Sequence, residues 1–326
     1  MQDLAALAET LAASPGLTGK RDIAAAVSGL GLGGGDAVPV GDDCAAIPHP
    51  AGGWQLLACE GMIEEFVAAM PWFAGWSAVM VNLSDVAAMG GRPVAVVNAL
   101  WADSEAAATP VLQGMADAAA AYGVPIVGGH TNLRARAGQL AVAVLGQADH
   151  LLTSFDARPG DALVMAVDLA GRWHDPHPFW DAATKADPAR LRRTLALLPA
   201  VAAGGAAHAA KDISQGGVIG TAAMLCECSG VGLTIDLDAV PAPPGADPAR
   251  WLTAFPSYGY LFATAPEGVP DLLRLFGAED IAAAAIGRFD DTGVVALGRD
   301  GARAPVIDLA GGLIGCAPAE GVPSHA

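Results

Sequence analysis

Apolar residues recur along the chain with two different spacings, and these spacings predict alternating helices and strands. A spacing of three and four residues predicts helices, and short apolar runs bounded by glycine, proline or charged residues predict strands. In the first half these patterns predict helices at 4–13, 21–30, 74–89 and 105–122, and strands at 37–40, 54–59, 93–100, 124–127 and 139–145. Strands that alternate with helices are typical of an α/β layer structure.

The second half repeats this alternation after a boundary that we place near residues 151–161. Its pattern predicts strands at 162–167, 232–237, 258–264, 282–287 and 294–297, and helices at 188–198, 217–228 and 272–276. The chain has 326 residues, and single cores usually stop growing at about 250–300 residues. We therefore predict two domains, 1–152 and 153–326, and we expect the small, polar tail after Gly315 to be mobile.

The chain is acidic, because 17 Lys and Arg stand against 34 Asp and Glu and give a net charge of −17. This charge argues against binding to nucleic acid or to an anionic membrane surface, and a polyanionic substrate would need metal ions. No apolar run approaches the ~20 residues of a transmembrane helix, and the N-terminus lacks the basic start of a secretory signal. We therefore expect a cytoplasmic protein that acts on a small molecule. Its five scattered cysteines indicate reduced thiols.

Five acidic residues lie at or near the ends of predicted elements, each close to glycine or another small residue: Asp42, Asp43, Glu60, Asp85 and Asp212. Carboxylates bind hard divalent cations, and magnesium usually joins one or two of them to nucleotide phosphates. The glycine-rich stretch 31–35 lacks the lysine of a Walker loop, so a phosphate cradle of that kind is not indicated. Each acid also has an ordinary interpretation, because Asp beside Gly favours a turn and Asp before a helix caps it.

The order of the motifs that contain these acids resembles a known superfamily. The matching segments are GDDCAAI at 41–47, NLSDVAAMGGRPVAV at 82–96, VGGHT at 127–131, RPGDAL at 158–163 and KDISQGG at 211–217. They are similar to segments of the ATP-binding aminoimidazole ribonucleotide (AIR) synthetase superfamily. That superfamily includes thiamine-monophosphate kinase, selenophosphate synthetase and the hydrogenase maturation protein that dehydrates a carbamoyl group. The resemblance covers about residues 40–298, and NLSDVAAMG is its most specific part.

The resemblance implies an α/β (α+β) fold with two domains. It implies a homodimer in which the N-terminal sheets form a shared barrel, and a C-terminal α/β sandwich. ATP would lie in a cleft lined by the acidic motifs, with Mg²⁺ between carboxylates and phosphates. Carried over residue by residue, the resemblance assigns metal binding to Asp42, Asp43, Glu60, Asp85 and Asp212. It assigns nucleotide contacts to Asp42, Asp43, Asn82, Asp85, Gly128, Gly129, His130, Lys211, Asp212 and Gln215.

Three positions depart from the superfamily's pattern. Glu60 and His130 each stand where an Asp is expected, and Gln215 stands in place of the second acid of DISDG. Glu60 keeps an oxygen ligand, whereas His130 and Gln215 each remove a negative charge. Because imidazole suits manganese or zinc better than magnesium, Mn²⁺ is a second candidate metal.

Two of these residues are candidate catalytic groups. His130 is either a general acid or base close to the phosphates or a structural replacement for a ligand. Lys211 either contacts a phosphate as a point charge or forms a simple surface pair with Asp212.

The irregular stretch 171–187 is long for a connecting loop and predicts an ordered binding loop. In this interpretation Arg172 meets an anionic group of the substrate and Trp173 or Trp180 covers a ring; alternatively, the aromatic residues are packing anchors. We predict a metal-dependent, ATP-using enzyme that transfers the γ-phosphoryl group to, or activates, an oxygen of a small metabolite. The alternatives are a nucleotide-binding regulatory protein with little turnover and a thiamine-monophosphate kinase.

Overall fold

The chain forms two compact units in a computed structural model, which describes residues 3–32 and 38–316. The five-strand unit contains residues 43–151 and 183–203. The seven-strand unit contains the described residues up to Asp42, residues 152–182, and those from 204 onward. Each unit therefore draws on both halves of the sequence, and the division into 1–152 and 153–326 stays a prediction.

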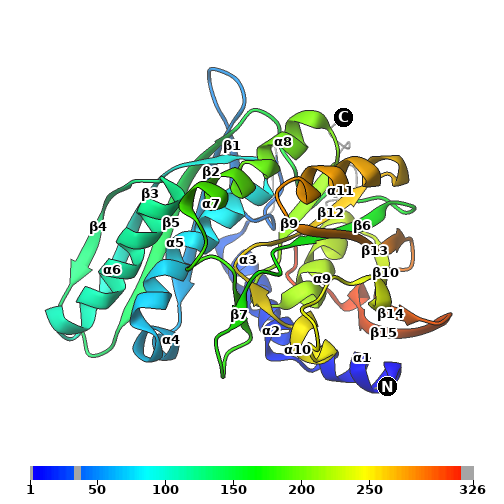
Figure 1. Ribbon diagram of the computed structural model, residues 1–326, viewed down its shortest axis with the longest axis horizontal. Helices are drawn as coiled ribbons and strands as arrows, with labels where there is room; N and C mark the ends of the chain where they lie inside the picture. Colours follow the sequence, from blue (N-terminus) through cyan, green and yellow to red (C-terminus); the bar gives the residue numbers. More distant parts are fainter. Residues whose placement is uncertain (1–2, 33–37, 317–326) are drawn as a thin grey trace. The chain divides into compact units, whose positions relative to one another are not determined.

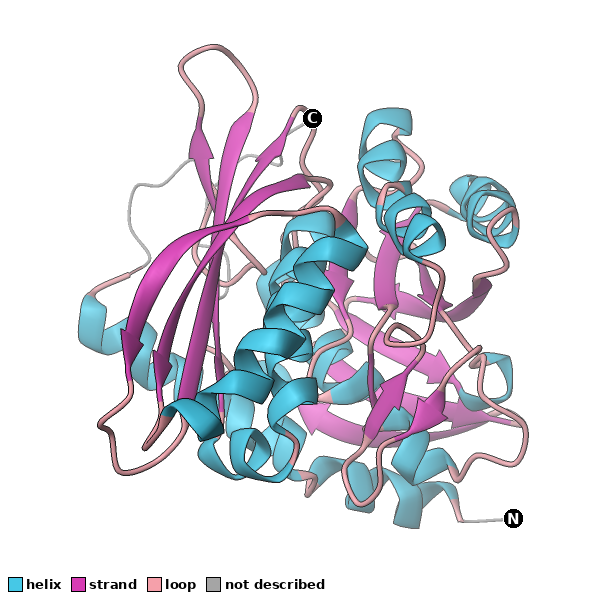
Figure 2. Cartoon of the chain, turned by 60° about the vertical axis from the view of Figure 1, so that its left-hand side comes forward, coloured by secondary structure: helices cyan, strands magenta, loops and turns pink. Residues whose placement is uncertain are grey.

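The five-strand unit has a twisted sheet (Figure 2). The sheet is mixed, and its strand order is β1-β2-β5-β3-β4. Strands β3 and β4 are parallel, and the other neighbours are antiparallel. The strands are β1 (Ala45–Pro48), β2 (Trp54–Met62), β3 (Arg92–Trp101), β4 (Ile126–Asn132) and β5 (Gln139–Ala148). The helices are α4 (Glu64–Ala69), α5 (Pro71–Ala88), α6 (Glu105–Tyr122), α7 (Pro188–Leu195) and α8 (Leu197–Gly204).

Helix α5 covers one face of this sheet, and α6 packs against α5 (Figure 1). Strand β5 alternates accordingly, because Leu140, Val142 and Val144 are buried while Leu145 on the opposite face is exposed. The two helices approach closely at Gly114, where an added Cβ would lie 1.9 Å from the carbonyl oxygen of Trp72. A glycine is therefore required at this crossing, and α5 is buried along most of its length.

The seven-strand unit has a mixed sheet with the order β15-β14-β10-β13-β6-β12-β9. These strands are β6 (Ala162–Val167), β9 (Ala209–Asp212), β10 (Gly232–Asp236), β12 (Gly259–Thr264), β13 (Ala282–Asp290), β14 (Val294–Arg299) and β15 (Ala302–Asp308). A small sheet contains β7 (Arg172–Trp173), β8 (Phe179–Asp181) and β11 (Phe255–Pro256). The helices are α1 (Leu4–Ala12), α2 (Pro15–Thr18), α3 (Asp22–Leu30), α9 (Gly217–Ser229), α10 (Pro248–Leu252) and α11 (Val269–Gly277). Short 3₁₀ turns are η1 (Gly19–Arg21), η2 (Leu237–Ala239), η3 (Pro266–Gly268) and η4 (Leu309–Gly311).

Both faces of the central strands of this sheet are covered. Every residue of β12 is buried, as expected for a strand between two helical layers. On one face Leu163 and Leu261 belong to the same core cluster as Ile219 of α9. On the other face Phe262 packs against Phe276 of α11, with ring centroids 5.3 Å apart.

The longer predicted elements are present, and the differences are local. The predicted helix 74–89 begins three residues earlier, at Pro71, because proline fits the first turn of a helix. The predicted helix 188–198 is wrong in its extent, since α7 ends at Leu195 and α8 begins at Leu197. The predicted strand 37–40 is also wrong, because 38–40 are not in a strand; residue 37 lies outside the described residues.

Three further predictions concern the loop, the tail and membrane spans. The stretch 171–187 contains the short hairpin β7–β8 instead of being wholly irregular. The tail from residue 317, which we expected to be mobile, lies outside the described residues. Of the helices in the described chain, none combines the length and the apolar composition needed to cross a bilayer.

Candidate metal-binding site

Two of the predicted metal ligands lie together in the five-strand unit. Asp85 is near the end of α5 and is 7% exposed, and Asp43 lies in the segment before β1 and is half-buried. A carboxylate oxygen of Asp43 lies within 4.8 Å of one of Asp85. Two carboxylates this close repel one another unless a cation or a proton lies between them. Their oxygen donors fit a hard divalent cation such as Mg²⁺ or Mn²⁺.

Asn82 provides a side-chain amide oxygen close to Asp85, because both residues lie on helix α5. It lies one turn before Asp85, on the same side of α5, and its side chain is fully buried. Its Nδ2 donates a hydrogen bond to the carbonyl of Ala78 at 2.8 Å. Its Oδ1 has no hydrogen-bond partner among the described residues. A buried amide oxygen without a donor is costly, so this atom fits a cation or a metal-bound water.

Asp42, although adjacent to Asp43 in sequence, is held in the seven-strand unit. Its carboxylate accepts hydrogen bonds from the backbone N–H of Ser154 at 2.8 Å and from the Ser154 hydroxyl at 2.7 Å. The Nζ of Lys211 lies 3.4 Å from the same hydroxyl oxygen. Lys211 is only 3% exposed, so its interpretation as a surface pair with Asp212 does not describe this buried side chain. Ser154 was not predicted, because nothing in its local sequence marks it.

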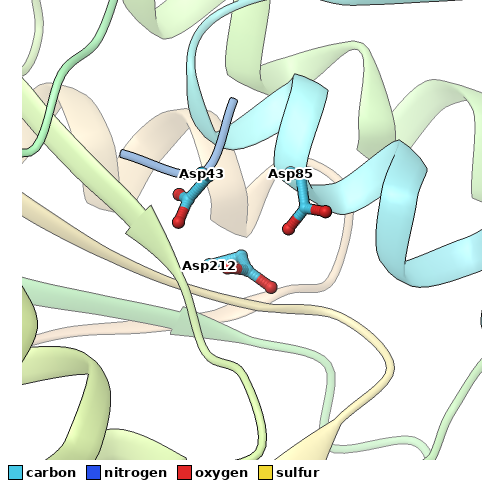
Figure 3. Close-up of side chains that lie close together, drawn as sticks. All are labelled: Asp43, Asp85 and Asp212. Atoms are coloured by element: carbon cyan, nitrogen blue, oxygen red, sulfur yellow. The ribbon is translucent and has the colours of Figure 1, made fainter. Parts of the chain in front are cut away.

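Asp212, which is labelled in Figure 3, is the last residue of strand β9. It is 4% exposed. The hydroxyl of Thr221 on α9 donates to the Asp212 carbonyl at 3.2 Å and accepts from the N–H of Ser214, also at 3.2 Å. The N–H of Ile213 donates to the carbonyl of Gly259 at 2.8 Å. These contacts fix the backbone of the KDISQGG loop, whereas the side chain of Gln215 is exposed.

The remaining sequence candidates of the five-strand unit lie on β2 and β4. Glu60 is exposed and alternates onto the face of β2 that α5 covers farther along the strand. His130 is exposed on the edge strand β4, with its ring centroid 5.9 Å from that of Trp101. Gly128 and Gly129 precede it in β4, and an added Cβ on Gly129 would lie 2.4 Å from the carbonyl oxygen of Asn98. Among the described residues, neither Glu60 nor His130 groups with the carboxylates of Asp43 and Asp85.

The three predicted substrate residues belong to the β7–β8 hairpin of the seven-strand unit. Arg172 forms an ion pair with the buried Asp181 at 2.9 Å, while 42% of the Arg172 side chain remains exposed. Trp180 is buried, and its Nε1 donates to the carbonyl of Asp168 at 2.9 Å. Trp173 packs edge-on against Trp180, with ring centroids 5.3 Å apart. Trp180 thus has the contacts of a packing anchor.

Cys226 and Cys228 lie on α9, and burial favours the neutral thiol at both positions. Burial raises the pKa of Cys228 far above its ordinary value, while Lys211 lowers it and Asp42 raises it by smaller amounts. The Cys228 thiol donates to the carbonyl of Gly41 at 3.6 Å. Burial also raises the pKa of Cys226. Because thiolates are the form that binds metals and acts as nucleophile, neither residue supplies that chemistry here.

Known proteins are similar to this chain in sequence and in fold. Residues 41–148 match the family model "AIR synthase related protein, N-terminal domain", and residues 157–299 match the corresponding C-terminal domain. The uncharacterized protein sll0787 of Synechocystis is 48% identical over 256 residues, which cover 78% of this chain and 79% of that protein. A thiamine-monophosphate kinase of Methanospirillum hungatei is 30% identical over 215 residues, 63% of this chain and 72% of the kinase.

A solved structure of T. maritima PurL complexed with ATP matches with a TM-score of 0.70 at 21% identity. The match covers 87% of this chain, and the chain spans about half the length of PurL, 48%. At this identity the likeness shows the fold. The predicted two-domain, mixed α/β fold of the AIR synthetase type is thereby confirmed, while the barrel shared between protomers stays a prediction.

Proposed function

Because the chain belongs to the AIR synthase related protein family, we propose that it is a metal-dependent enzyme that uses ATP. Its relatives include ATP-using kinases, and the PurL structure holds ATP. In this proposal the γ-phosphoryl group passes to, or activates, an oxygen of a small metabolite. Such a transfer depends on positioning and charge neutralisation more than on a protein nucleophile.

The observation that carries this proposal is the pair of carboxylates Asp43 and Asp85 beside the Asn82 side-chain oxygen, which has no hydrogen-bond partner within residues 3–32 and 38–316. We propose that both carboxylates hold Mg²⁺ or Mn²⁺ and that Asn82 orients a metal-bound water. The family motif adds Asp212 as a further ligand, and Glu60 as an oxygen donor at the end of β2. A bound divalent cation would neutralise the charge that develops on the transferring phosphoryl group.

The other candidate residues have distinct proposed roles. Asp42 acts through Ser154, because both of its oxygens already accept hydrogen bonds there. Lys211 adds a buried positive charge at the same hydroxyl and contributes to phosphate binding. Gly128 and Gly129 allow the nucleotide to approach the backbone of β4, as residues without a Cβ do. His130 is proposed as the general acid or base.

Further roles are proposed for Gln215 and the β7–β8 hairpin. Gln215 offers an uncharged amide to the nucleotide, where an Asp would add repulsion. In the hairpin, Arg172 keeps an exposed part of its guanidinium for an anionic substrate, beside the ring of Trp173. The packed ring of Trp180 supports that of Trp173.

Calorimetry with Mn²⁺ and a non-hydrolysable ATP analogue tests the site. We expect Asp85→Asn to weaken binding of the metal–nucleotide complex by about tenfold or more, which corresponds to about 1.4 kcal/mol. Asp149→Asn is the matched control, because the Asp149 side chain is 83% exposed and pairs with Arg92 at the surface. Equal affinity of the wild type and Asp85→Asn, or the absence of binding to the wild type, would contradict the proposal.

Product analysis separates the alternatives. His130 and Gln215 remove two of the charges expected from the family motifs, which favours a nucleotide-binding regulatory protein as the second candidate. Tight binding without release of ADP over hours, with any candidate acceptor, would support that candidate. Formation of thiamine diphosphate from thiamine phosphate in the same assay would identify a thiamine-monophosphate kinase.

We also propose that the protein is a homodimer joined through the five-strand sheet. On the face opposite α5, this sheet exposes the apolar side chains of Leu57, Val97, Val127 and Leu145, with 38–64% of their surface accessible. Leu57 and Leu145 are direct cross-strand partners. An apolar sheet face of this kind favours burial against a second protein surface.

A further inference from the structure

Helix α2 packs against the KDISQGG loop within the seven-strand unit, and the turn η1 that follows it contacts the same loop. At Gly16 an added Cβ would lie 2.4 Å from the carbonyl oxygen of Gln215 and 3.0 Å from the Cα of Gly216. Backbone therefore meets backbone at this point, and a side chain at position 16 would push the N-terminal segment off the loop.

Lys20, in the short turn η1, makes a polar contact at this junction. Its Nζ donates a hydrogen bond to the hydroxyl of Ser214 at 3.1 Å, although 194 residues separate the two in sequence. The contact is partly buried, and a hydrogen bond with a charged donor is stronger than a neutral one. Arg21, the next residue, is exposed. The two adjacent cations thus differ in their surroundings.

Ser214 connects Lys20 to the backbone that carries Asp212. The Ser214 N–H donates to the hydroxyl of Thr221, and that hydroxyl donates to the carbonyl of Asp212. Thr221 is fully buried, so this bridge is rigid on the side of α9. Lys20 contacts the same loop through the Ser214 side chain.

We propose that Lys20 is a positioning residue that holds the 213–217 loop in the conformation that Asp212 requires as a ligand. The inference rests on the proposed function, because only there does Asp212 bind a metal. A ligand must be held close to its productive geometry before the cation arrives, and β9 offers only four residues of regular structure to do so. The hydrogen bond from Lys20 replaces the restraint that a longer strand would provide.

The test compares Lys20→Met, Lys20→Arg and the control Arg21→Met in the full chain, with two measurements. Hydrogen exchange of the amides of Ile213 to Gly217, without ligand, reports the loop itself. Electron paramagnetic resonance titration of Mn²⁺ in the presence of a non-hydrolysable ATP analogue reports the site. In Lys20→Met we expect exchange to rise and Mn²⁺ affinity to fall, each by about tenfold, the usual effect of losing a hydrogen bond from a charged donor. We expect Lys20→Arg to keep most of the loop protection and most of the Mn²⁺ affinity. Arg21→Met should leave both the exchange and the Mn²⁺ affinity as in the wild type.

Two outcomes would overturn the proposal. In the first, Lys20→Met leaves loop exchange and Mn²⁺ affinity as in the wild type. In the second, Lys20→Arg or Arg21→Met shows the same losses as Lys20→Met, which would indicate a general effect on the N-terminal segment. Failure of the proposed function gives a different result, because the wild type then binds no Mn²⁺ with the analogue. Loop exchange in Lys20→Met would still show whether Lys20 holds the loop.

Discussion

The two sheets of this protein use apolar residues in different ways. In the seven-strand sheet, the central strands are buried on both faces, and β12 has no exposed residue. In the five-strand sheet, α5 covers one face. The other face, the open face, presents Leu57, Val97 and Leu145 to solvent. The first sheet completes its core within the chain, whereas the second leaves apolar area that a partner can bury. The carboxylates Asp43 and Asp85 belong to the unit whose sheet is half-covered.

Truncation of an apolar side chain to alanine gives the largest expected difference between the two sheets, measured as the loss in the free energy of unfolding. Phe262→Ala removes a fully buried ring that packs on Phe276, so we expect it to lower the free energy of unfolding by about 3–5 kcal/mol. Leu57→Ala on the open face removes a half-exposed side chain, and in dilute protein we expect less than about 1 kcal/mol. Urea unfolding at low protein concentration measures both. Similar losses for the two variants would mean that the open face is already buried.

The second expected effect concerns dimer dissociation when a charged residue is introduced on the open face. Leu145→Asp places a carboxylate amid apolar side chains, and we expect the dissociation constant of the homodimer to rise by about a hundredfold. Gln147→Asp is the control, because Gln147 is exposed on the same face of β5 at the end of the strand. Light scattering over a range of concentrations measures the association. A wild-type protein that is monomeric at all concentrations would contradict the shared barrel.

Thiol reactivity gives the smallest effect and reports on the same face. Cys59 is exposed and alternates onto the open side with Leu57. Partial desolvation of the thiol by its neighbours, and to a smaller extent the charge of Glu60, raise its pKa above the ordinary value. Since the thiolate is the reactive form, alkylation by iodoacetamide should accelerate as the pH rises through 9 and beyond.

The dimer proposal adds an expectation for the same experiment. Cys59 should react several-fold faster in Leu145→Asp than in the wild type, because dissociation uncovers the face. Mass spectrometry of the alkylated peptides identifies the site, with the buried Cys44, Cys226, Cys228 and Cys316 as slow internal references. Equal rates in both proteins would show that no partner covers Cys59.

Elements with a long apolar pattern were predicted well, and the short strand β9 was not. Helices α5 and α6 each run for 18 residues, so their period repeats enough times to be recognised. Strand β9 has the sequence Ala-Ala-Lys-Asp and was not predicted, because a lysine and an aspartate within four residues do not indicate a buried strand. Its burial results from pairing with β12, which lies far along the sequence.

The acidic motifs, and the position of Asn82 one turn before Asp85, follow from the order of residues alone, because a helical period depends only on neighbouring residues. The hydrogen-bond partners of these polar groups follow from the assembly of distant segments. Asp42 is bound by Ser154, 112 residues away, and Lys20 is bound to Ser214. Hydrogen bonds over such separations depend on how strands and helices assemble. No local pattern therefore encodes them.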